Sequence, residues 1–384
     1  MKLLVVTPYF YPKLGGLENY AYHISQGLHK KYKWEIVVVT SNHEEKKYKE
    51  EMLNGFKIYR LPYWFKLSNT PVNPLWYFAI ATIIKSEMPD CINAHTPVPF
   101  ISDVTARAST KAKIPFVLTY HNDVVKSSLL VSLCIKIYYQ LFGFATGKLA
   151  TTIIATSDFY AKRSLFLKKF AAKVQLVPPG VDVPFYDSIN PKPDLIQEYK
   201  DKKVVMFVGQ LDKTHLHKGL NYLIEAIATV KKDIPNILLL IIGRGDMISE
   251  YKDMAQKMGI EDNIVFKTSV EDPDLVAYYK LSDVVVLPTV SNAEGFGMVL
   301  IEAGAAKKPV IGTNVGGVPF VIIENETGYL IPPKDVTSLA KKILEVVSDK
   351  KLQNRLGNNG YSQAVEKYSW EKQINKTDSI LKNI

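Results

Sequence analysis

Residues 282–317 constrain the fold and the ligand of this chain more than any other stretch, because they place acidic residues after a predicted buried strand. The segment SDVVVLP (282–288) is rich in β-branched residues and ends at a proline, which predicts a buried parallel strand. The loop SNAEGFG follows, then an expected helix over 298–306 and later a Gly316-Gly317 pair. A strand that runs through a glycine loop into a helix offers free backbone N–H groups and a positive dipole end. That arrangement favours an anionic ligand.

Two carboxylates flank this predicted crevice, Glu294 in the loop and Glu302 in the helix. Carboxylates beside an anion site repel a phosphate, so they are better suited to accept hydrogen bonds from neutral hydroxyls. A ligand that carries both phosphates and many hydroxyls is a nucleotide sugar. The alternative is that Glu294 is an exposed loop acid and Glu302 a solvated helix position.

The length and the cysteine content exclude several classes of protein. A chain of 384 residues exceeds the usual single domain, so we expect two domains. Only Cys91 and Cys134 are present, which excludes a disulfide framework and a cysteine zinc cluster. The first residues read as a strand rather than a signal peptide, and no run of eighteen apolar residues predicts a transmembrane helix. We therefore expect a cytoplasmic protein.

The net charge of +10 is concentrated in one segment. Residues 124–174 contain eight Lys or Arg and a single acid, Asp158, around the apolar and aromatic stretch SLLVSLCIKIYYQLFGF. A basic, amphipathic segment favours docking on an anionic membrane surface, which would make the protein peripheral on the inner face of the cell membrane. A buried helix with solvated lysines is the alternative. Nucleic acid is disfavoured as a partner, because no binding motif accompanies the charge.

Strand and helix patterns alternate through both halves of the chain. The segment PPGVDVP (178–184) interrupts them with three prolines and a glycine, which indicates a domain boundary. We expect an N-terminal domain over 1–183 and a C-terminal domain over 184–369. Both are predicted to be α/β, doubly wound, Rossmann-like parallel-sheet domains that face each other across a cleft.

Several chemically active residues follow predicted strands, and ligands of open parallel sheets bind at the carboxyl ends of strands. The Gly15-Gly16 turn lacks the three-glycine spacing of dinucleotide-binding proteins, so nicotinamide or flavin is not indicated. His121 ends another predicted strand, and Lys218 follows a third as a point charge suited to phosphate. The alternatives are a structural histidine and a solvated loop lysine. The Asp272-Pro273-Asp274 sequence is better explained as a capped helix start than as a metal site.

Six aromatic residues crowd the segment 62–84 together with prolines. A helix core is the default interpretation of the second trio, and a surface that contacts an acceptor or a membrane is the alternative.

Taken together, the motifs resemble the retaining glycosyltransferases of family 4, which have the two-domain GT-B fold. The resemblance covers nearly the whole chain. It rests on the segments GGLEN, TYHND, PPGVD, VGQL with HKG, IIGRGD, EGFGMVLIEA and TNVGGVPF. The spaced glutamates of EGFGMVLIEA are its most specific part.

The resemblance implies roles for residues of the C-terminal half. Glu302 would bind the ribose hydroxyls, and Glu294 the hydroxyls of the donor sugar. Backbone N–H groups would meet the sugar and the phosphates at three successive positions, Phe296, Gly297 and Met298.

Further roles that the resemblance implies involve both halves. Lys218 would hold the diphosphate, and Gly16 would close over it from the other domain. His121 would lie near the sugar and its reacting carbon, while the backbone of Val270 would contact the base. The N-terminal domain would bind the acceptor, and the terminal helix over 370–384 would cross back onto it.

One position departs from the family pattern. The family commonly has an arginine directly after the glycine of VGQL, where this chain has Gln210. The loop from there to Lys218 is also longer and contains His215 and His217. One fixed positive charge is therefore missing from the predicted diphosphate site, and a histidine or Arg244 is a candidate to replace it.

The predicted reaction is transfer of a sugar from a nucleotide sugar to a hydroxyl acceptor, with retention at the anomeric carbon. A glycan or glycolipid, lipid-linked or membrane-borne, is the expected acceptor, and neither a metal nor a cofactor is expected to be required. The alternatives are an epimerase of the same fold, a phosphorylase-like enzyme and a non-catalytic protein that binds nucleotide sugars.

Overall fold

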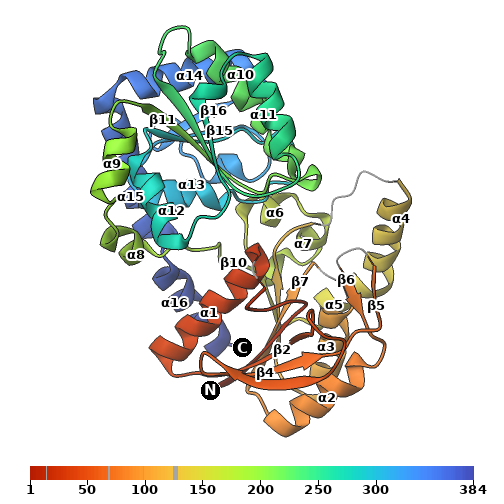
Figure 1. The fold of residues 1–384 in the computed structure, drawn as a ribbon. Coiled ribbons are helices and arrows are strands. Elements are labelled where there is room, and N and C mark those ends of the chain that lie inside the picture. The colour runs from red at the N-terminus through yellow and green to blue at the C-terminus, as the bar shows by residue number, and fades with distance from the viewer. Residues whose placement is uncertain (14, 68–69, 98, 124–128) are drawn as a thin grey trace. The chain divides into compact units, whose positions relative to one another are not determined.

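The structure is a computed structural model that describes residues 1–13, 15–67, 70–97, 99–123 and 129–384 (Figure 1). Part of the segment predicted to meet a membrane, including Lys126, lies outside the described residues, as does the side chain of Cys134. Cys91 is buried as a free thiol. No helix of the described chain is both long and apolar enough to cross a membrane.

The chain divides into two compact units. The N-terminal unit comprises Met1–Gly180 together with Trp370–Ile384, and the C-terminal unit comprises Val181–Ser369. The division falls inside the proline-rich segment and three residues before the predicted boundary.

The N-terminal unit is built on a sheet with the strand order β10-β9-β8-β7-β1-β2-β4-β3. All its strand pairs are parallel except β3 with β4. The strands of this sheet are β1 (Lys2–Thr7), β2 (Glu35–Ser41), β3 (Lys49–Leu53), β4 (Phe56–Leu61), β7 (Cys91–Thr96), β8 (Phe116–Tyr120), β9 (Thr152–Ala155) and β10 (Val174–Leu176). A separate hairpin joins β5 (Phe65–Leu67) and β6 (Thr70–Val72).

The helices of this unit connect the parallel strands. They are α1 (Gly16–Tyr32), α2 (Trp76–Glu87), α3 (Ile101–Ala112), α4 (Leu129–Tyr138), the π-helical turn η1 (Tyr139–Gly143), α5 (Phe144–Leu149), α6 (Asp158–Arg163), α7 (Leu165–Lys169) and η2 (Ala171–Lys173). The central strands β1, β2 and β7 are buried almost throughout, as expected for a parallel sheet covered on both faces.

The last helix of the chain, α16 (Trp370–Lys382), packs on α1 within the N-terminal unit (Figure 1). Trp34 donates from Nε1 to Oδ1 of Asp378 at 2.8 Å, and His23 stacks on Trp370 with ring centroids 4.7 Å apart. Ile374 lies over Gly27, where a Cβ atom would come within 2.1 Å of its side chain. The two helices are therefore fitted to each other by close packing as well as by polar contacts.

The C-terminal unit is built on a parallel sheet with the strand order β13-β12-β11-β14-β15-β16. Its strands are β11 (Lys203–Val208), β12 (Ile237–Ile242), β13 (Ile264–Lys267), β14 (Val284–Leu287), β15 (Val310–Thr313) and β16 (Gly328–Ile331). The strand order reverses direction between β11 and β14. In doubly wound sheets, ligands bind outside the carboxyl ends of the strands at such a switch point.

The helices of the C-terminal unit cover both faces of this sheet (Figure 1). They are α8 (Val183–Ser188), α9 (Pro193–Tyr199), η3 (Lys213–Lys218), α10 (Leu220–Val230), α11 (Ile248–Lys257), η4 (Glu261–Asn263), α12 (Asp272–Leu281), α13 (Met298–Ala305), η5 (Val318–Phe320), α14 (Val336–Ser348) and α15 (Lys350–Lys367).

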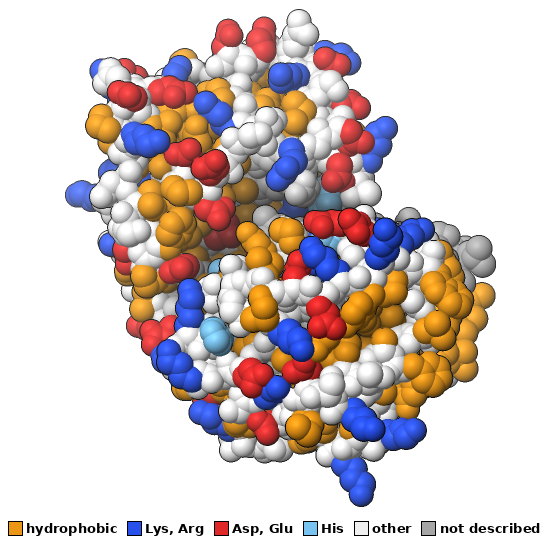
Figure 2. Space-filling view, turned by 60° about the horizontal axis from the view of Figure 1, so that its bottom comes forward, with side chains coloured by type: hydrophobic (Ala, Val, Ile, Leu, Met, Phe, Trp, Pro, Cys, Tyr) orange, Lys and Arg blue, Asp and Glu red, His pale blue; other side chains and the backbone are white. Residues whose placement is uncertain are grey.

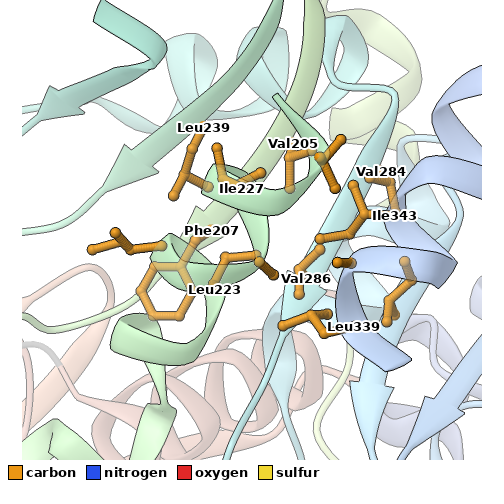
Figure 3. Close-up of a cluster of buried hydrophobic side chains, with 14 of the residues drawn as sticks. Val205, Phe207, Leu223, Ile227, Leu239, Val284, Val286, Leu339 and Ile343 are labelled. Atoms are coloured by element: carbon orange, nitrogen blue, oxygen red, sulfur yellow. The ribbon is translucent and has the colours of Figure 1, made fainter. Parts of the chain in front are cut away.

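Each face of this sheet has its own apolar core. On one face α10, α11 and α14 pack against the strands, where Phe207, Leu223 and Ile343 are fully buried (Figure 3). On the other face α12, α13 and α15 form a second cluster. Replacing one such buried Leu or Ile by Ala typically costs about 2–5 kcal/mol. The cores therefore hold the strand ends, and the loops that follow them, in fixed positions.

Candidate active site

A pocket of about 670 Å³ opens at the carboxyl ends of β11, β12 and β13. It is lined by Val208, Gly209, Gln210, Lys218, Ile242, Gly243, Arg244, Thr268, Ser269, Val270, Glu271, Leu275 and Val299. Four residues singled out from the sequence are among them: Gln210, Lys218, Arg244 and Val270. The structure therefore gathers residues from three strand ends and from α13 around one space large enough for a small ligand.

Lys218 is the last residue of η3, and backbone contacts fix its position. The carbonyl oxygen of His217 accepts hydrogen bonds from the backbone N–H of Val290 and from the hydroxyl of Thr289, both at 2.8 Å. Gly219 follows with φ of 74°, and a Cβ atom there would lie 2.1 Å from the carbonyl oxygen of Pro288. Only glycine fits this turn, which ties Lys218 to the loop after β14.

Lys218 forms an ion pair with Glu294, with Nζ 2.8 Å from Oε2. The side chains are only 17% and 14% exposed. Water screens such an enclosed pair less than a surface pair, so each partner compensates the charge of the other. A phosphate that bound Lys218 would compete with the carboxylate for the same ammonium group.

The loop that carries Glu294 is held by Gly316 and Gly317. Gly317 donates its backbone N–H to the carbonyl oxygen of Glu294 at 2.7 Å, and Gly316 donates to Oδ1 of Asn292 at 3.1 Å. A Cβ atom on Gly317 would lie 2.1 Å from the carbonyl oxygen of Gly295. The backbone donors of this glycine pair therefore hold the loop that carries Glu294.

The start of α13 is the better place for an anion. Gly297 precedes the helix with φ of 87°, and no side chain caps the helix. Among the described residues, no group accepts the backbone N–H of Gly297 or Met298. The side chains of Phe296 and Met298 are partly buried and pack against the second core.

Glu302 lies on α13 one turn after Val299, which lines the pocket. Its Oε2 accepts a hydrogen bond of 2.7 Å from the hydroxyl of Tyr279, a fully buried residue of α12. The pKa of the Glu302 carboxyl is raised, because the effect of burial exceeds the lowering by the Tyr279 hydroxyl and the Lys218 charge. One carboxylate oxygen is thus held in place by a residue that sequence reasoning missed, because nothing in the sequence of α12 marks Tyr279.

A cationic side chain lies in the same pocket as Gln210, where the family pattern has an arginine. Gln210 and Arg244 are both exposed and line the same pocket as Lys218. Of the two histidines in the intervening loop, His215 is bound through Nδ1 to Asp212 at 2.9 Å. Burial lowers the pKa of His217, and the Lys218 charge lowers it further. Arg244 is thus a permanent positive charge at this pocket, whereas His217 is held towards its neutral form.

In the N-terminal unit, His121 follows β8 directly and pairs with a second histidine. Nδ1 of His95, a buried residue of β7, lies 2.9 Å from Nε2 of His121, and Tyr20 contacts both rings edge-on. Burial lowers the pKa of His95 to about 3. The pKa of His121 is also well below its usual range, because of burial and the neighbouring His95. Both rings are therefore neutral at pH 7, and their mutual contact occupies Nδ1 of His95 and Nε2 of His121.

Gly16 is the first residue of α1, directly after the extended Gly15. A Cβ atom on Gly16 would meet nothing within 4 Å, and its φ is not positive. Neither packing nor backbone conformation therefore demands a glycine at this position.

Metal-binding side chains do not cluster in the described part of the chain: no group of three or more His, Cys, Asp or Glu is placed to hold a metal ion.

Two family models match the chain in succession. Residues 14–184 match the model described as Glycosyltransferase Family 4, and residues 190–363 match Glycosyl transferases group 1.

Similar proteins match along almost the whole chain. The O-antigen chain mannosyltransferase C of Escherichia coli is 27% identical over 97% of this chain and 96% of its own length. The phosphatidyl-myo-inositol mannosyltransferase of Mycobacterium leprae is 24% identical over 96% and 93%. Among solved structures, the sucrose-phosphate synthase of Thermosynechococcus elongatus has a TM-score of 0.77 at 21% identity, over 100% of this chain and 98% of its own. Anabaena HepE in complex with UDP-glucose has a TM-score of 0.72 at 21% identity, over 99% and 100%.

Proposed function

We propose a reaction for this chain, which belongs to the group 1 and family 4 glycosyltransferases. It transfers a hexose from a nucleoside diphosphate sugar to a hydroxyl group, with retention at the anomeric carbon. The chain is a glycosyltransferase with the GT-B fold, as its motifs predict. An epimerase or a non-catalytic binding protein is not favoured, because the relatives that match along the whole chain are named as transferases.

The observation that carries the proposal is the enclosed ion pair of Lys218 with Glu294 beside the pocket. A diphosphate offers Lys218 more negative charge than one carboxylate does, so it takes the place of Glu294 on the ammonium group. The released carboxylate then accepts hydrogen bonds from the hydroxyls of the hexose. HepE, a structural neighbour, was solved in complex with UDP-glucose, a donor of this chemical class.

Glu302 binds the ribose in this proposal. Tyr279 occupies Oε2 of its carboxylate, which leaves the other oxygen for a ribose hydroxyl. Val270 and its neighbours at the end of β13 line the same pocket, so the base is placed beside them.

Arg244 supplies the positive charge that Gln210 lacks. Arg244 lines the pocket, and Glu271 is the single carboxylate among the described residues that line it. The N–H groups of Gly297 and Met298 complete the anion site at the start of α13.

The reaction proceeds on one face of the sugar. The bond between the anomeric carbon and the diphosphate oxygen breaks, and the acceptor oxygen bonds to the same face of that carbon. The acceptor proton passes to the departing phosphate. Lys218, Arg244 and the start of α13 stabilise the negative charge that grows on the leaving group, so the proposal requires no metal. His121 stays neutral and orients the sugar through Nδ1. No carboxylate is assigned as a covalent nucleophile.

The acceptor is a glycan or glycolipid at an anionic membrane surface, which α4 and η1 contact in this proposal. Leu133, Ile137 and Leu141 follow one another at helical spacing and are 53%, 48% and 62% exposed. The opposite side is anchored, because the Tyr138 hydroxyl donates to Oδ2 of Asp103 at 2.7 Å.

Basic residues accompany this apolar ridge and match the charge of an anionic membrane. Lys136 lies on α4 itself, and further exposed cations follow at Lys148, Lys162, Arg163, Lys168 and Lys169. Figure 2 shows hydrophobic side chains gathered along the right-hand side of the N-terminal unit, with Lys and Arg side chains near them. Apolar side chains flanked by lysines are the pattern of a helix that lies in the membrane interface.

A thermal-shift panel of nucleoside diphosphates and their hexose conjugates tests the donor class. A ligand at 100 times its Kd stabilises the folded protein by about 2.7 kcal/mol, which is readily detected. We expect at least one nucleoside diphosphate to raise the Tm of the wild type and not of Lys218→Ala. If no nucleoside diphosphate raises the Tm of the wild type, the proposal is wrong.

Flotation with vesicles tests the membrane contact. We expect binding to vesicles that contain phosphatidylglycerol, and loss of that binding when Leu133, Ile137 and Leu141 are replaced by Ser. A control that replaces the exposed Met52, Met258 and Val365 by Ser should still bind. Equal binding of both triple variants would contradict the assignment of this surface.

A further inference from the structure

Three lysines converge on two tyrosine rings at one corner of the N-terminal unit. Nζ of Lys13 lies 3.1 Å from the ring centroid of Tyr9, and Nζ of Lys66 lies 5.9 Å from it. Lys66 is also 4.9 Å from the centroid of Tyr63, and Lys46 is 5.4 Å from it. In the described part of the chain no carboxylate forms an ion pair with any of the three ammonium groups. We call these five residues the lysine–tyrosine cluster.

A buried arginine adds a fixed charge next to this cluster. Arg60, at 2% exposure, donates from Nε to Glu51 and from Nη2 to the carbonyl oxygen of Tyr11, each at 2.7 Å. Its Nη1 has no partner among the described residues, and neither do Oγ1 of Thr40 or Nδ1 of His43. Thr40 is paired with Arg60 in the β2–β4 register, and His43 follows β2. Unpartnered buried polar atoms are rare in folded proteins, and three of them at neighbouring strand ends indicate a site built for a polar ligand.

The charge at this corner is positive. Burial lowers the pKa of Lys13, while the Glu18 carboxylate raises it and Lys66 lowers it, so these three groups share one electrostatic environment. Glu44 contacts His43 at 4.0 Å, and Glu51 is already paired with Arg60 and Lys49. The cluster and Arg60 together have four cations, against the three carboxylates of Glu18, Glu44 and Glu51. Ammonium groups that rest on phenol rings keep N–H donors for an anion.

We propose that the lysine–tyrosine cluster binds a phosphate group carried by the acceptor, so that the enzyme glycosylates a phosphorylated sugar or polyol, free or as the headgroup of a phospholipid. This inference rests on the proposed transferase function and names the class of its acceptor. Lys13, Lys46 and Lys66 contact the phosphate oxygens, and Tyr9 and Tyr63 border the ring that carries the phosphate.

The position of the cluster along the sheet fits an acceptor. Tyr9 and Lys13 lie between β1 and Gly16, while Tyr63 follows β4. His121 ends β8 at the same edge, and only β7 separates β8 from β1. Neighbouring strands are about 4.8 Å apart, so the cluster begins roughly 10 Å from His121 along this edge. A sugar or polyol ring fits between a phosphate in the cluster and a hydroxyl that reacts near His121.

Calorimetric titration of the full-length protein, without donor, tests the site. The probes are glucose 6-phosphate as a phosphomonoester, glycerophosphoinositol as the phosphodiester of a lipid headgroup, and glucose as the uncharged reference. The variant combines Lys13→Ala, Lys46→Ala and Lys66→Ala. The matched control combines Lys85→Ala, Lys372→Ala and Lys376→Ala, three exposed lysines of the same unit, and has the same net charge. Binding of a nucleoside diphosphate is measured in parallel.

We expect one phosphate ester to bind the wild type and the control, and to bind the cluster variant at least about 30-fold more weakly. Preference for the diester would identify a lipid headgroup, in agreement with the membrane-borne acceptor proposed above. Preference for the monoester would identify a free sugar phosphate and would contradict that membrane-borne acceptor. Unchanged binding of the nucleoside diphosphate to the cluster variant keeps the donor site separate from this result. The inference is overturned if neither ester binds better than glucose, or if the control loses as much affinity as the cluster variant. Loss of nucleoside diphosphate binding in the wild type would instead contradict the proposed function.

Discussion

The strand-end edges of the two units differ in chemistry although both sheets are doubly wound. In the C-terminal unit, the edge carries two carboxylates, an ion-paired lysine and glycine turns that bring backbones together. In the N-terminal unit, the corresponding edge carries a pair of neutral histidines and a cluster of lysines on tyrosine rings. The shared fold supplies the same kind of edge twice, and the loops decide what each edge binds.

The lysines of the two edges also differ in their surroundings. Lys218 is enclosed and already compensated by Glu294, so a ligand must exchange with its partner. Lys13, Lys46 and Lys66 have no acidic partner in the described chain and rest on aromatic faces. The first arrangement suits a ligand with both phosphates and hydroxyls, since both members of the pair find new contacts. The second suits an isolated anionic group.

The largest effect is expected from the ion pair of the C-terminal unit. Lys218→Ala should lower kcat by about 100-fold or more, because losing one charged contact to the leaving group costs about 3 kcal/mol. The charge-swapped variant, with Lys218→Glu and Glu294→Lys, keeps an ion pair and should keep the fold while it remains inactive. Steady-state kinetics and circular dichroism measure the two properties. Recovery of activity in the swapped variant would show that the pair has only a structural role.

Removing the support of Glu302 should have the next largest effect. Tyr279→Phe removes the hydroxyl that positions the carboxylate, and Glu302→Gln removes its charge. We expect each to weaken nucleoside diphosphate binding by about 10-fold, since a hydrogen bond to a charged group contributes about 1.5–3 kcal/mol. Calorimetry with ribose and 3′-deoxyribose forms of the same nucleotide locates the effect. Variants that still discriminate between the two forms as the wild type does would contradict ribose binding by Glu302.

The histidine pair of the N-terminal unit should make stability depend on pH. The folded pKa of His95, about 3, lies below its value in the unfolded chain, so the unfolded state binds more protons between pH 6.5 and 3. The stabilisation is complete above about pH 6.5 and is lost as the pH falls, by about 2 kcal/mol between pH 6.5 and 5. Denaturant unfolding at several pH values measures it. A His95→Gln variant should show a shallower fall, and an unchanged slope would contradict burial of a neutral His95.

The smallest effect on stability, and an informative one, is expected at Gly16. Because a Cβ atom there meets nothing within 4 Å, Gly16→Ala should change the free energy of unfolding by no more than about 0.5 kcal/mol. Transfer activity should nevertheless fall, if a ligand approaches this backbone. The matched change Gly27→Ala, which meets Ile374 at 2.1 Å, should destabilise the protein instead. Full activity of Gly16→Ala would remove Gly16 from the site.

Sequence patterns predicted the alternation of strands and helices well, because apolar periodicity and proline positions are local signals. The strand over 282–288, the following loop and the helix from Met298 all lie close to where the pattern placed them. The role of Gly316 and Gly317 was not predicted, since the acceptors of their N–H groups lie more than twenty residues away in the loop before α13. A glycine pair reveals close approach of a backbone without revealing which backbone.

The contacts that define the candidate site could not be predicted from the sequence. Lys218 and Glu294 are 76 residues apart, and their pairing depends on the turn at Gly219 against Pro288. Tyr279 contacts Glu302 from another helix, and the sequence of α12 gave no signal of this contact. The lysines of the lysine–tyrosine cluster lie on two loops and one strand, so only the fold shows that they converge.

A crystal structure with a nucleoside diphosphate hexose bound would test the exchange of partners at Lys218 most directly. We predict a diphosphate oxygen within hydrogen-bonding distance of Nζ of Lys218. The carboxylate of Glu294 should accept a hydrogen bond from a hexose hydroxyl. An intact ion pair between Lys218 and Glu294, with the diphosphate bound elsewhere, would contradict it.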